Sequence, residues 1–214
     1  MSVVAPASYA QARIWLDERI RFDPGKPQIA IYNMPFLYRL YPGHNLSIKQ
    51  LHHALQLIVK KHQSLRTSLI FDAEKNLLMQ RVIDHKDDDK SMFSMSQSSF
   101  YTDEQLNDIM HEEKRNPQLF DLAHGLVFRC HVLYYKEISS NDILSDKDEL
   151  IFNFHHAMFD FPSMKMFLRD LNQAYTTGQL FYDDNTALRY LDCKYQYFSY
   201  IPFITHFESV SFRC

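Results

Sequence analysis

The sequence predicts an α/β fold, in the form of an α+β sandwich in which helices flank a mixed β-sheet. Strand-like and helix-like segments alternate along the chain, 46% of its 214 residues are apolar, and 17 Phe and 13 Tyr are available for a core. A chain of 214 residues can bury one substantial core. We therefore expect one packed domain, or part of one larger domain, rather than a disordered segment.

Helix signals recur at four places. Residues 8–22 are expected to form a short helix, and residues 47–50 (SIKQ) have a capping-box pattern ahead of apolar residues at helical spacing. Thr102 can cap a helix that runs to about Lys114. Pro162 suits the first turn of a fourth helix. The buried face of that helix is expected to contain Met164, Phe167, Leu168, Leu171 and Tyr175.

Strand signals lie between these helices. Residues 29–40 have strand character, interrupted by Pro35, which is typical of a sheet edge or a bulge. Two polar stretches, 84–99 and 139–148, are expected to be surface loops. The other strand-like segments are 65–71 and 77–83, which would pair as a hairpin, together with 127–135 and 150–154.

Composition and charge argue against several classes of function. With only 4 Gly and no GxGxxG or GxxxxGK[ST] pattern, a glycine-rich phosphate loop is not expected. The net charge of −3 offers no basic surface for a nucleic acid. Cys130, Cys193 and Cys214 are odd in number and widely spaced, so we expect reduced thiols rather than a disulfide framework or a zinc site.

No membrane or secretion signal is found in the sequence. No apolar run approaches the roughly 20 residues that a membrane helix needs. Residues 1–12 have neither the basic nor the apolar region of a secretory signal. We therefore expect a cytoplasmic location.

Residues 154–163 (FHHAMFDFPS) carry the candidate chemistry. His155 and His156 end an apolar strand, where consecutive side chains point to opposite faces. We expect one imidazole to face inward and the other to face a cleft, where it could act as a base near neutral pH. The alternative is a pair of ordinary histidines, one of them buried and hydrogen-bonded.

Asp160 follows His156 by four residues and has three possible roles. It could cap the next helix, or it could form a buried ion pair, for which Arg66 is the candidate partner. His156 and Asp160 could also share a metal ion, but no further ligand set at suitable spacing accompanies them. We therefore expect no metal.

Six segments together are similar to the motifs of one enzyme family, and they follow the family's order. Residues 155–161 (HHAMFDF) are similar to its HHxxxDG signature, with Phe161 at the position of the glycine. On these motifs, the chain resembles the condensation domains of nonribosomal peptide synthetases. The other five segments are 8–15 (SYAQARIW, for SxAQxRLW), 61–67 (KHQSLRT, for RHExLRT), 120–129 (FDLAHGLVFR, for FDLxxGPLxR), 167–175 (for the helix after the histidine loop) and 190–196 (YLDCKYQ, for YxDYAxWQ).

The resemblance implies a chloramphenicol acetyltransferase-like lobe, of which a full condensation domain has two. Residues 1–180 would be the N-terminal lobe, and residues 181–196 would begin the segment between the lobes. Residues 197–214 would be a divergent tail with no counterpart in the family. We expect the chain to stop before the second lobe and therefore to be incomplete as a catalyst.

The resemblance also implies an activity and a set of roles. The family joins a donor thioester to an acceptor amine, and His156 would be the catalytic histidine that deprotonates or orients the amine. His155 and Asp160 would be structural, with Arg66 pairing Asp160. Phe161 could strain the loop or partly fill the tunnel between the lobes, since glycine often serves a positive φ or a close approach.

No metal or tightly bound cofactor is implied for this chain. The expected partners are a C-terminal condensation lobe and peptidyl or aminoacyl carrier proteins, which bring their own phosphopantetheine arms. Two alternatives remain open. One is a CoA-dependent O-acyltransferase of the same superfamily, and the other is a non-catalytic carrier-binding or remnant domain.

Overall fold

The structure of the chain is a computed structural model that describes residues 4–21, 29–84, 92–139, 141–180 and 207–209. The segment 181–206, with Cys193 and the predicted motif at 190–196, lies outside these ranges, as does Cys214. In chain order the elements are β1 (Val4–Pro6), α1 (Tyr9–Ile20), β2 (Asn33–Leu40), β3 (Leu46–Ser47), α2 (Ile48–Lys61), a 3₁₀ turn (Gln63–Arg66), β4 (Thr67–Asp72), β5 (Leu77–Val82), β6 (Ser94–Phe100), α3 (Asp103–Arg115), β7 (Phe128–Tyr135), β8 (Ile143–Leu144), β9 (Glu149–His155), α4 (Ser163–Thr177) and β10 (Phe207–Ser209).

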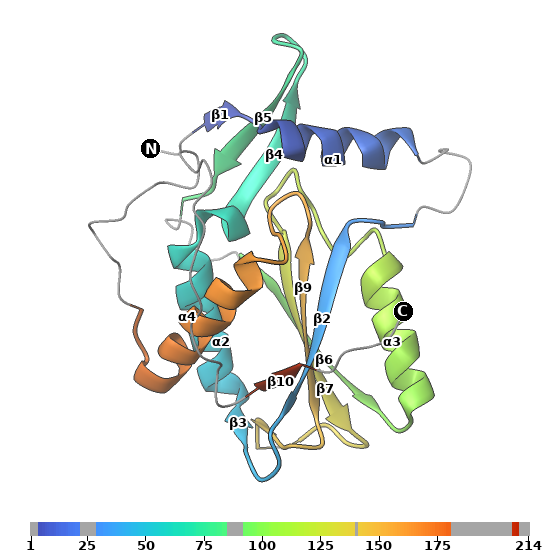
Figure 1. The fold of residues 1–214 in the computed structure, drawn as a ribbon, viewed down its shortest axis with the longest axis vertical. Helices are drawn as coiled ribbons and strands as arrows, with labels where there is room; N and C mark the ends of the chain where they lie inside the picture. The colour runs from blue at the N-terminus through green and yellow to red at the C-terminus, as the bar shows by residue number, and fades with distance from the viewer. Residues whose placement is uncertain (1–3, 22–28, 85–91, 140, 181–206, 210–214) are drawn as a thin grey trace.

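A mixed sheet with the strand order β10-β2-β9-β7-β6 forms the centre of the molecule (Figure 1). Strands β6 and β7 are parallel, and the other neighbouring strands are antiparallel. Helices α2 and α4 cover one face of this sheet, and α3 covers the other (Figure 1). The predicted α/β sandwich, a mixed sheet flanked by helices, is confirmed.

The alternation of side chains along β9 separates the two faces of the sheet. Leu150, Phe152 and Phe154 point into the large core shared with α2 and α4. Ile151 points into the smaller core beneath α3. Because His155 is two residues beyond Asn153 and four beyond Ile151, the same alternation directs its side chain to the α3 side, at the end of the strand.

A smaller three-stranded antiparallel sheet, β1-β5-β4, lies at one end of the main sheet, beside α1 (Figure 1). The predicted hairpin is confirmed as β4 and β5, paired from Thr67↔Val82 to Asp72↔Leu77. Ser8 caps α1 in a full capping box with Gln11. Ile14 of α1 packs with Leu69 and other apolar residues between the hairpin and the histidine loop.

Two predicted loops contain strands. The polar stretch 84–99 includes most of β6, which pairs with β7, and the stretch 139–148 includes β8, which pairs with β3. The loop prediction was therefore wrong for these residues. The reason for β6 is that it is an edge strand, where polar side chains such as Ser96 and Ser98 are tolerated, so the sequence lacks an apolar alternation.

Two finer predictions concern the capping box at Ser47 and the proline of β2. Ser47 accepts a hydrogen bond from the backbone N–H of Gln50, as predicted, but the backbone N–H of Ser47 donates to the hydroxyl of Tyr175 instead of to Gln50. At Pro35, β2 pairs with β9 alone within the described residues, because β10 pairs only with Tyr38–Leu40. The interpretation of Pro35 as an edge or bulge position stays a prediction, because the residues that follow β10 lie outside the described ranges.

None of the helices in the described ranges combines the length and the apolar character that a membrane span requires.

Candidate active site in the histidine loop

The histidine loop, residues 155–161, connects the end of β9 to the start of α4. Its first residues are fixed by backbone hydrogen bonds: His155 donates to the carbonyl of Val127 at 3.0 Å, and His156 donates to the carbonyl of Tyr32 at 2.9 Å. A turn then forms as Met158 donates to the carbonyl of His155. The two imidazoles therefore leave a rigid strand end and lie in different surroundings.

The imidazole of His155 is buried, with 3% of the residue exposed. Its Nε2 lies 3.1 and 3.2 Å from the two carboxylate oxygens of Glu18 on α1. Its Nδ1 accepts the backbone N–H of Ala157 at 3.2 Å, and the ring edge packs on Phe120. Because a carboxylate accepts and an N–H donates, His155 carries its proton on Nε2. The predicted inward-facing histidine is His155, and its structural role stays a prediction.

The imidazole of His156 is partly exposed and has the opposite arrangement. Its Nδ1 lies 2.9 Å from the carbonyl oxygen of Phe159, and its ring centroid is 6.1 Å from that of Tyr32. A carbonyl oxygen can only accept, so Nδ1 carries the proton, and Nε2 of the neutral ring keeps its lone pair. Nε2 makes no hydrogen bond within the described residues. Such a nitrogen can accept a proton from a substrate, while the catalytic role of His156 stays a prediction.

The predicted ion pair between Arg66 and Asp160 is wrong. Asp160 is exposed, and its carboxylate accepts the backbone N–H of Ser163, the first residue of α4, at 3.0 Å. The guanidinium of Arg66 donates to the carbonyls of Ile83 and Lys60. Asp160 therefore supports the start of a helix, which was the alternative interpretation, because a carboxylate near solvent has no need of a buried cation.

Phe161, at the position of the family's glycine, does not strain the loop. Among the described residues other than glycine, positive φ angles occur only at Asn76, Lys136 and Asp142. Phe161 is 73% exposed, and its ring centroid lies 6.0 Å from that of Phe36. The ring therefore projects from the loop at the surface, and whether it obstructs access to His156 stays a prediction.

A hollow of about 760 Å³ lies beside the loop, on the α3 side of the sheet. His155, and not His156, is among its lining residues, together with Glu18 and Phe120. The C-terminal end of α3 and the residues after it contribute polar groups, including Arg115 and Asn116. The hollow is therefore adjacent to the buried histidine and is not lined by His156.

Sequence reasoning gave no role to the adjacent carboxylates Asp17 and Glu18 of α1. The hydroxyl of Tyr32 donates to Asp17 at 2.6 Å, and this hydrogen bond lowers the pKa of Asp17 and raises the pKa of Tyr32. Glu18 contacts His155, which is 137 positions away in the sequence. No local pattern could have indicated these contacts, since both depend on how α1 packs against the end of the main sheet.

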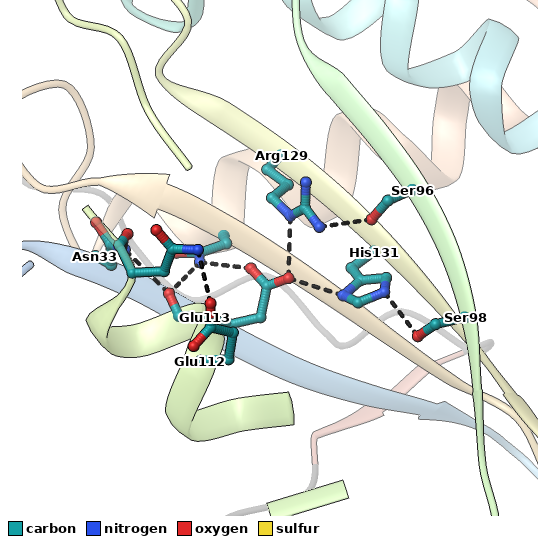
Figure 2. A network of polar contacts seen from close by, with 9 residues as sticks. Asn33, Ser96, Ser98, Glu112, Glu113, Arg129 and His131 are labelled. Atoms are coloured by element: carbon teal, nitrogen blue, oxygen red, sulfur yellow. Dashed lines mark hydrogen bonds and ion pairs between the residues drawn. The ribbon is translucent and has the colours of Figure 1, made fainter. Parts of the chain in front are cut away.

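A second polar network lies on the α3 face of the sheet (Figure 2). The buried carboxylate of Glu113 accepts hydrogen bonds from Nδ1 of His131 at 2.7 Å, Nε of Arg129 at 3.0 Å and Nδ2 of Asn153 at 2.8 Å. Burial acts to raise the pKa of Glu113, but the hydrogen bonds from His131 and Asn153 and the charge of Arg129 outweigh it, so the pKa is lowered. The network fastens α3 to β7 and β9.

The same network continues to Ser98 of β6, whose hydroxyl lies 2.9 Å from Nε2 of His131 (Figure 2). The order Ser98, His131, Glu113 is that of a nucleophilic triad. However, neither Ser98 nor His131 lines the hollow beside the loop, and no donor pair for an oxyanion accompanies Ser98 in the described contacts. We interpret this network as structural.

No group of three or more His, Cys, Asp or Glu side chains that could hold a metal ion is found in the part of the chain that the structure describes. Nδ1 of His156 donates to the carbonyl of Phe159, and the carboxylate of Asp160 accepts the backbone N–H of Ser163. Cys130 is buried in the core, and burial raises the pKa of its thiol well above the usual range.

A family model described as the condensation domain matches residues 1–195, which is most of the chain. The chain belongs to the condensation domain family. The resemblance inferred from the six motifs is thereby confirmed.

Curated relatives of this condensation domain are large multidomain synthetases. The hybrid PKS-NRPS synthetase apdA of Emericella nidulans is 28% identical over 190 residues, which are 87% of this chain and 4% of that protein. Fusarin C synthetase of Gibberella fujikuroi is 30% identical over 175 residues, which are 79% of this chain and 4% of the synthetase. The chain thus spans a small fraction of the length of each relative.

Solved structures share the fold of this chain. The X-domain of teicoplanin biosynthesis, in its complex with OxyB, matches with a TM-score of 0.63 and 23% identity over 87% of this chain and 36% of that chain. The condensation domain of the monacolin K polyketide synthase MokA matches with a TM-score of 0.58 and 15% identity over 83% of this chain and 35% of that chain. At these identities the likeness concerns the fold alone.

Proposed function

We propose that this condensation domain contributes the histidine loop to an acyl transfer between two carrier proteins. The acceptor amine attacks the carbonyl carbon of the donor thioester, so that a C–N bond forms and the C–S bond breaks. Nε2 of His156 takes the amine proton and passes it to the departing sulfur, so that a free thiol remains on the phosphopantetheine arm of the donor carrier. The chain itself binds no cofactor in this proposal.

The observation that carries the proposal is the hydrogen bond from Nδ1 of His156 to the carbonyl of Phe159, at 2.9 Å. This bond orients the ring and leaves the lone pair of Nε2 available, as a general base requires. The family assignment supplies the reaction class. Because the chain covers only a short share of each relative, the proposal includes a second lobe as a required partner.

The test is amide formation by the chain together with a C-terminal condensation lobe, an acyl donor carrier and an aminoacyl acceptor carrier. We expect His156→Ala to lower the rate on the order of 100-fold or more, because a positioned base contributes at least that factor. His124→Ala is the matched control, since the His124 side chain is 81% exposed at the surface and contacts Asp121.

Product on the acceptor carrier is measured by mass spectrometry of the intact protein. Equal amide formation by His156→Ala and the unaltered chain would contradict the proposal. Parallel reactions with a CoA thioester and an alcohol acceptor test the O-acyltransferase alternative. Faster transfer to the alcohol than to the carrier-bound amine would favour that alternative.

One observation favours a second candidate function, a domain that binds a carrier protein without catalysis. The exposed ring of Phe161 stands where the family has glycine, in the loop that would face the substrate arms. A carrier protein that binds the chain and second lobe with no amide product, and equally well in His156→Ala, would support this candidate.

A further inference from the structure

The two adjacent histidines present opposite nitrogens to their surroundings. His155 donates from Nε2 to Glu18 and accepts the backbone N–H of Ala157 at Nδ1. His156 donates from Nδ1 to the carbonyl of Phe159 and leaves Nε2 without a partner in the described structure. Two neighbouring imidazoles with the same covalent structure therefore hold different tautomers, and something in the fold must select them.

We propose that Glu18 is a positioning residue that selects the tautomer of His155 and, through it, the shape of the loop that orients His156. Its link to catalysis rests on the function proposed above. Glu18 is the charged side chain in contact with His155 Nε2, and 20% of its side chain is exposed. As a carboxylate it can only accept, so it requires the Nε2–H form of His155.

The opposite tautomer of His155 would lose both of its polar contacts. A proton on Nδ1 would face the backbone N–H of Ala157, and the lone pair of Nε2 would face the carboxylate of Glu18. His155 and Ala157 are buried, and an unsatisfied polar atom is costly there. The contact between Glu18 and Nε2 of His155 therefore leaves Nδ1 of His155 as the nitrogen that accepts the N–H of Ala157.

The contact with Ala157 transmits this choice to His156. Ala157 follows His156 directly, and the acceptor on His155 fixes its backbone N–H. Together with the hydrogen bond from Met158 to the carbonyl of His155, this contact shapes the turn that brings the carbonyl of Phe159 to Nδ1 of His156. If Nδ1 of His155 carried the proton, the N–H of Ala157 would be repelled and the turn would relax, which would loosen the Phe159–His156 hydrogen bond.

Helix α1 is held firmly enough to act in this way. Its start is capped by Ser8, and Ile14 is buried against the hairpin. Near its end, Asp17 accepts the hydroxyl of Tyr32, whose own carbonyl accepts the backbone N–H of His156. The neighbouring carboxylates Asp17 and Glu18 thus connect α1 to both sides of the histidine loop.

The test is long-range ¹H–¹⁵N NMR of the full chain labelled at histidine, recorded at a pH at which the imidazoles are neutral. We expect a pyridine-type ¹⁵N shift for Nδ1 of His155 and for Nε2 of His156. Glu18→Gln keeps an oxygen acceptor, so it should retain both signatures. Glu18→Leu should average the two ¹⁵N shifts of His155 and weaken the single-tautomer signature of His156.

Glu112→Leu is the matched control. Glu112 lines the same hollow but contacts Asn116 rather than a histidine, so its removal should leave both signatures unchanged. Unchanged histidine signatures in Glu18→Leu would overturn the proposal. If Glu18→Leu does not fold, the unaltered chain and Glu18→Gln still decide it, because a protonated Nδ1 on His155 in either would overturn it.

The NMR readout does not depend on turnover. Loss of the tautomer signatures in Glu18→Leu supports the positioning role even if His156→Ala proves fully active, in which case only the proposed function fails. Conversely, an inactive His156→Ala with tautomers that do not respond to Glu18 overturns this proposal alone.

Discussion

At the scale of single residues, the histidine loop is held by backbone groups more than by charges. His156 donates to a carbonyl through its ring, and Asp160 accepts a backbone N–H at the start of α4. The expected partner of Asp160, Arg66, instead donates to the carbonyl of Lys60 in α2 and to the carbonyl of Ile83, directly after β5. Both geometries follow from the many backbone donors and acceptors that a turn and a helix end leave unpaired.

Phe161 is the residue at which this loop departs most visibly from the family signature. We expect Phe161→Gly to change the free energy of unfolding by about 1 kcal/mol or less, because the ring is exposed and the loss is mainly backbone entropy. We also expect Phe161→Gly to speed the modification of His156 by diethyl pyrocarbonate, because the substitution removes an exposed ring from the same loop.

The rate is followed by peptide mass spectrometry, with the exposed His124 as the internal reference in the same sample. An unchanged ratio of His156 to His124 modification would show that the ring of Phe161 does not shield the imidazole.

At the scale of the elements, one buried carboxylate joins the two helices on the large-core face. Asp170 of α4 lies 2.7 Å from Nζ of Lys61 and 2.8 Å from Nε2 of His62, both at the end of α2. Its other oxygen accepts from Arg169 at 3.0 and 3.1 Å. Burial acts to raise the pKa of Asp170, but the hydrogen bonds from His62 and Lys61 outweigh it, and the pKa is strongly lowered.

Removing this charge should loosen the contact between α2 and α4. We expect Asp170→Asn to lower the free energy of unfolding by about 3 kcal/mol at neutral pH, because the remaining cations lose a buried partner. Urea unfolding followed by circular dichroism measures the change. Asp146→Asn is the control, since Asp146 is outside this cluster and accepts only the backbone N–H of Gly43 in the described contacts.

A loss below about 1 kcal/mol for Asp170→Asn, the range of exposed ion pairs, would contradict a buried clamp between the two helices.

At the scale of the whole molecule, buried carboxyl groups with shifted pKa values contribute to the dependence of stability on pH. The pKa is lowered at Asp170 and Glu113 and raised at Glu149, where burial dominates over the hydrogen bond from Arg39. The displacement is strongest at Asp170. Groups with a lowered pKa stabilise the fold above their unfolded pKa of about 4, and this contribution is lost as the pH falls further.

We therefore expect the chain to lose stability on acidification below about pH 4, since the groups with a lowered pKa, Asp170 above all, outweigh the opposite effect of Glu149. The thermal midpoint, measured by circular dichroism between neutral pH and about pH 3, should fall. The thermal midpoint of Asp170→Asn should fall less steeply than that of the unaltered chain. The reason is that the variant lacks the carboxyl group whose pKa is lowered most on folding. The same slope in both proteins would argue against Asp170 as the main source.

The sequence by itself determined the local parts of this protein. Apolar periodicity and capping residues predicted α2, α3 and α4, and apolar runs around a polar turn predicted the β4–β5 hairpin. Six short motifs in order were enough to identify the family, which the match over residues 1–195 confirms. These features depend on neighbours in the chain, so their signal is present in the residues themselves.

Only the tertiary structure decided which distant groups meet. Glu18 reaches His155 across 137 positions, and Asp160 uses the adjacent helix rather than Arg66. Strand β6 pairs because β7 lies beside it, although its serine-rich sequence has no apolar alternation. Periodicity encodes the face that an element buries, but the partner of a polar group depends on where the other elements pack, and the tautomers of the two histidines follow from that packing.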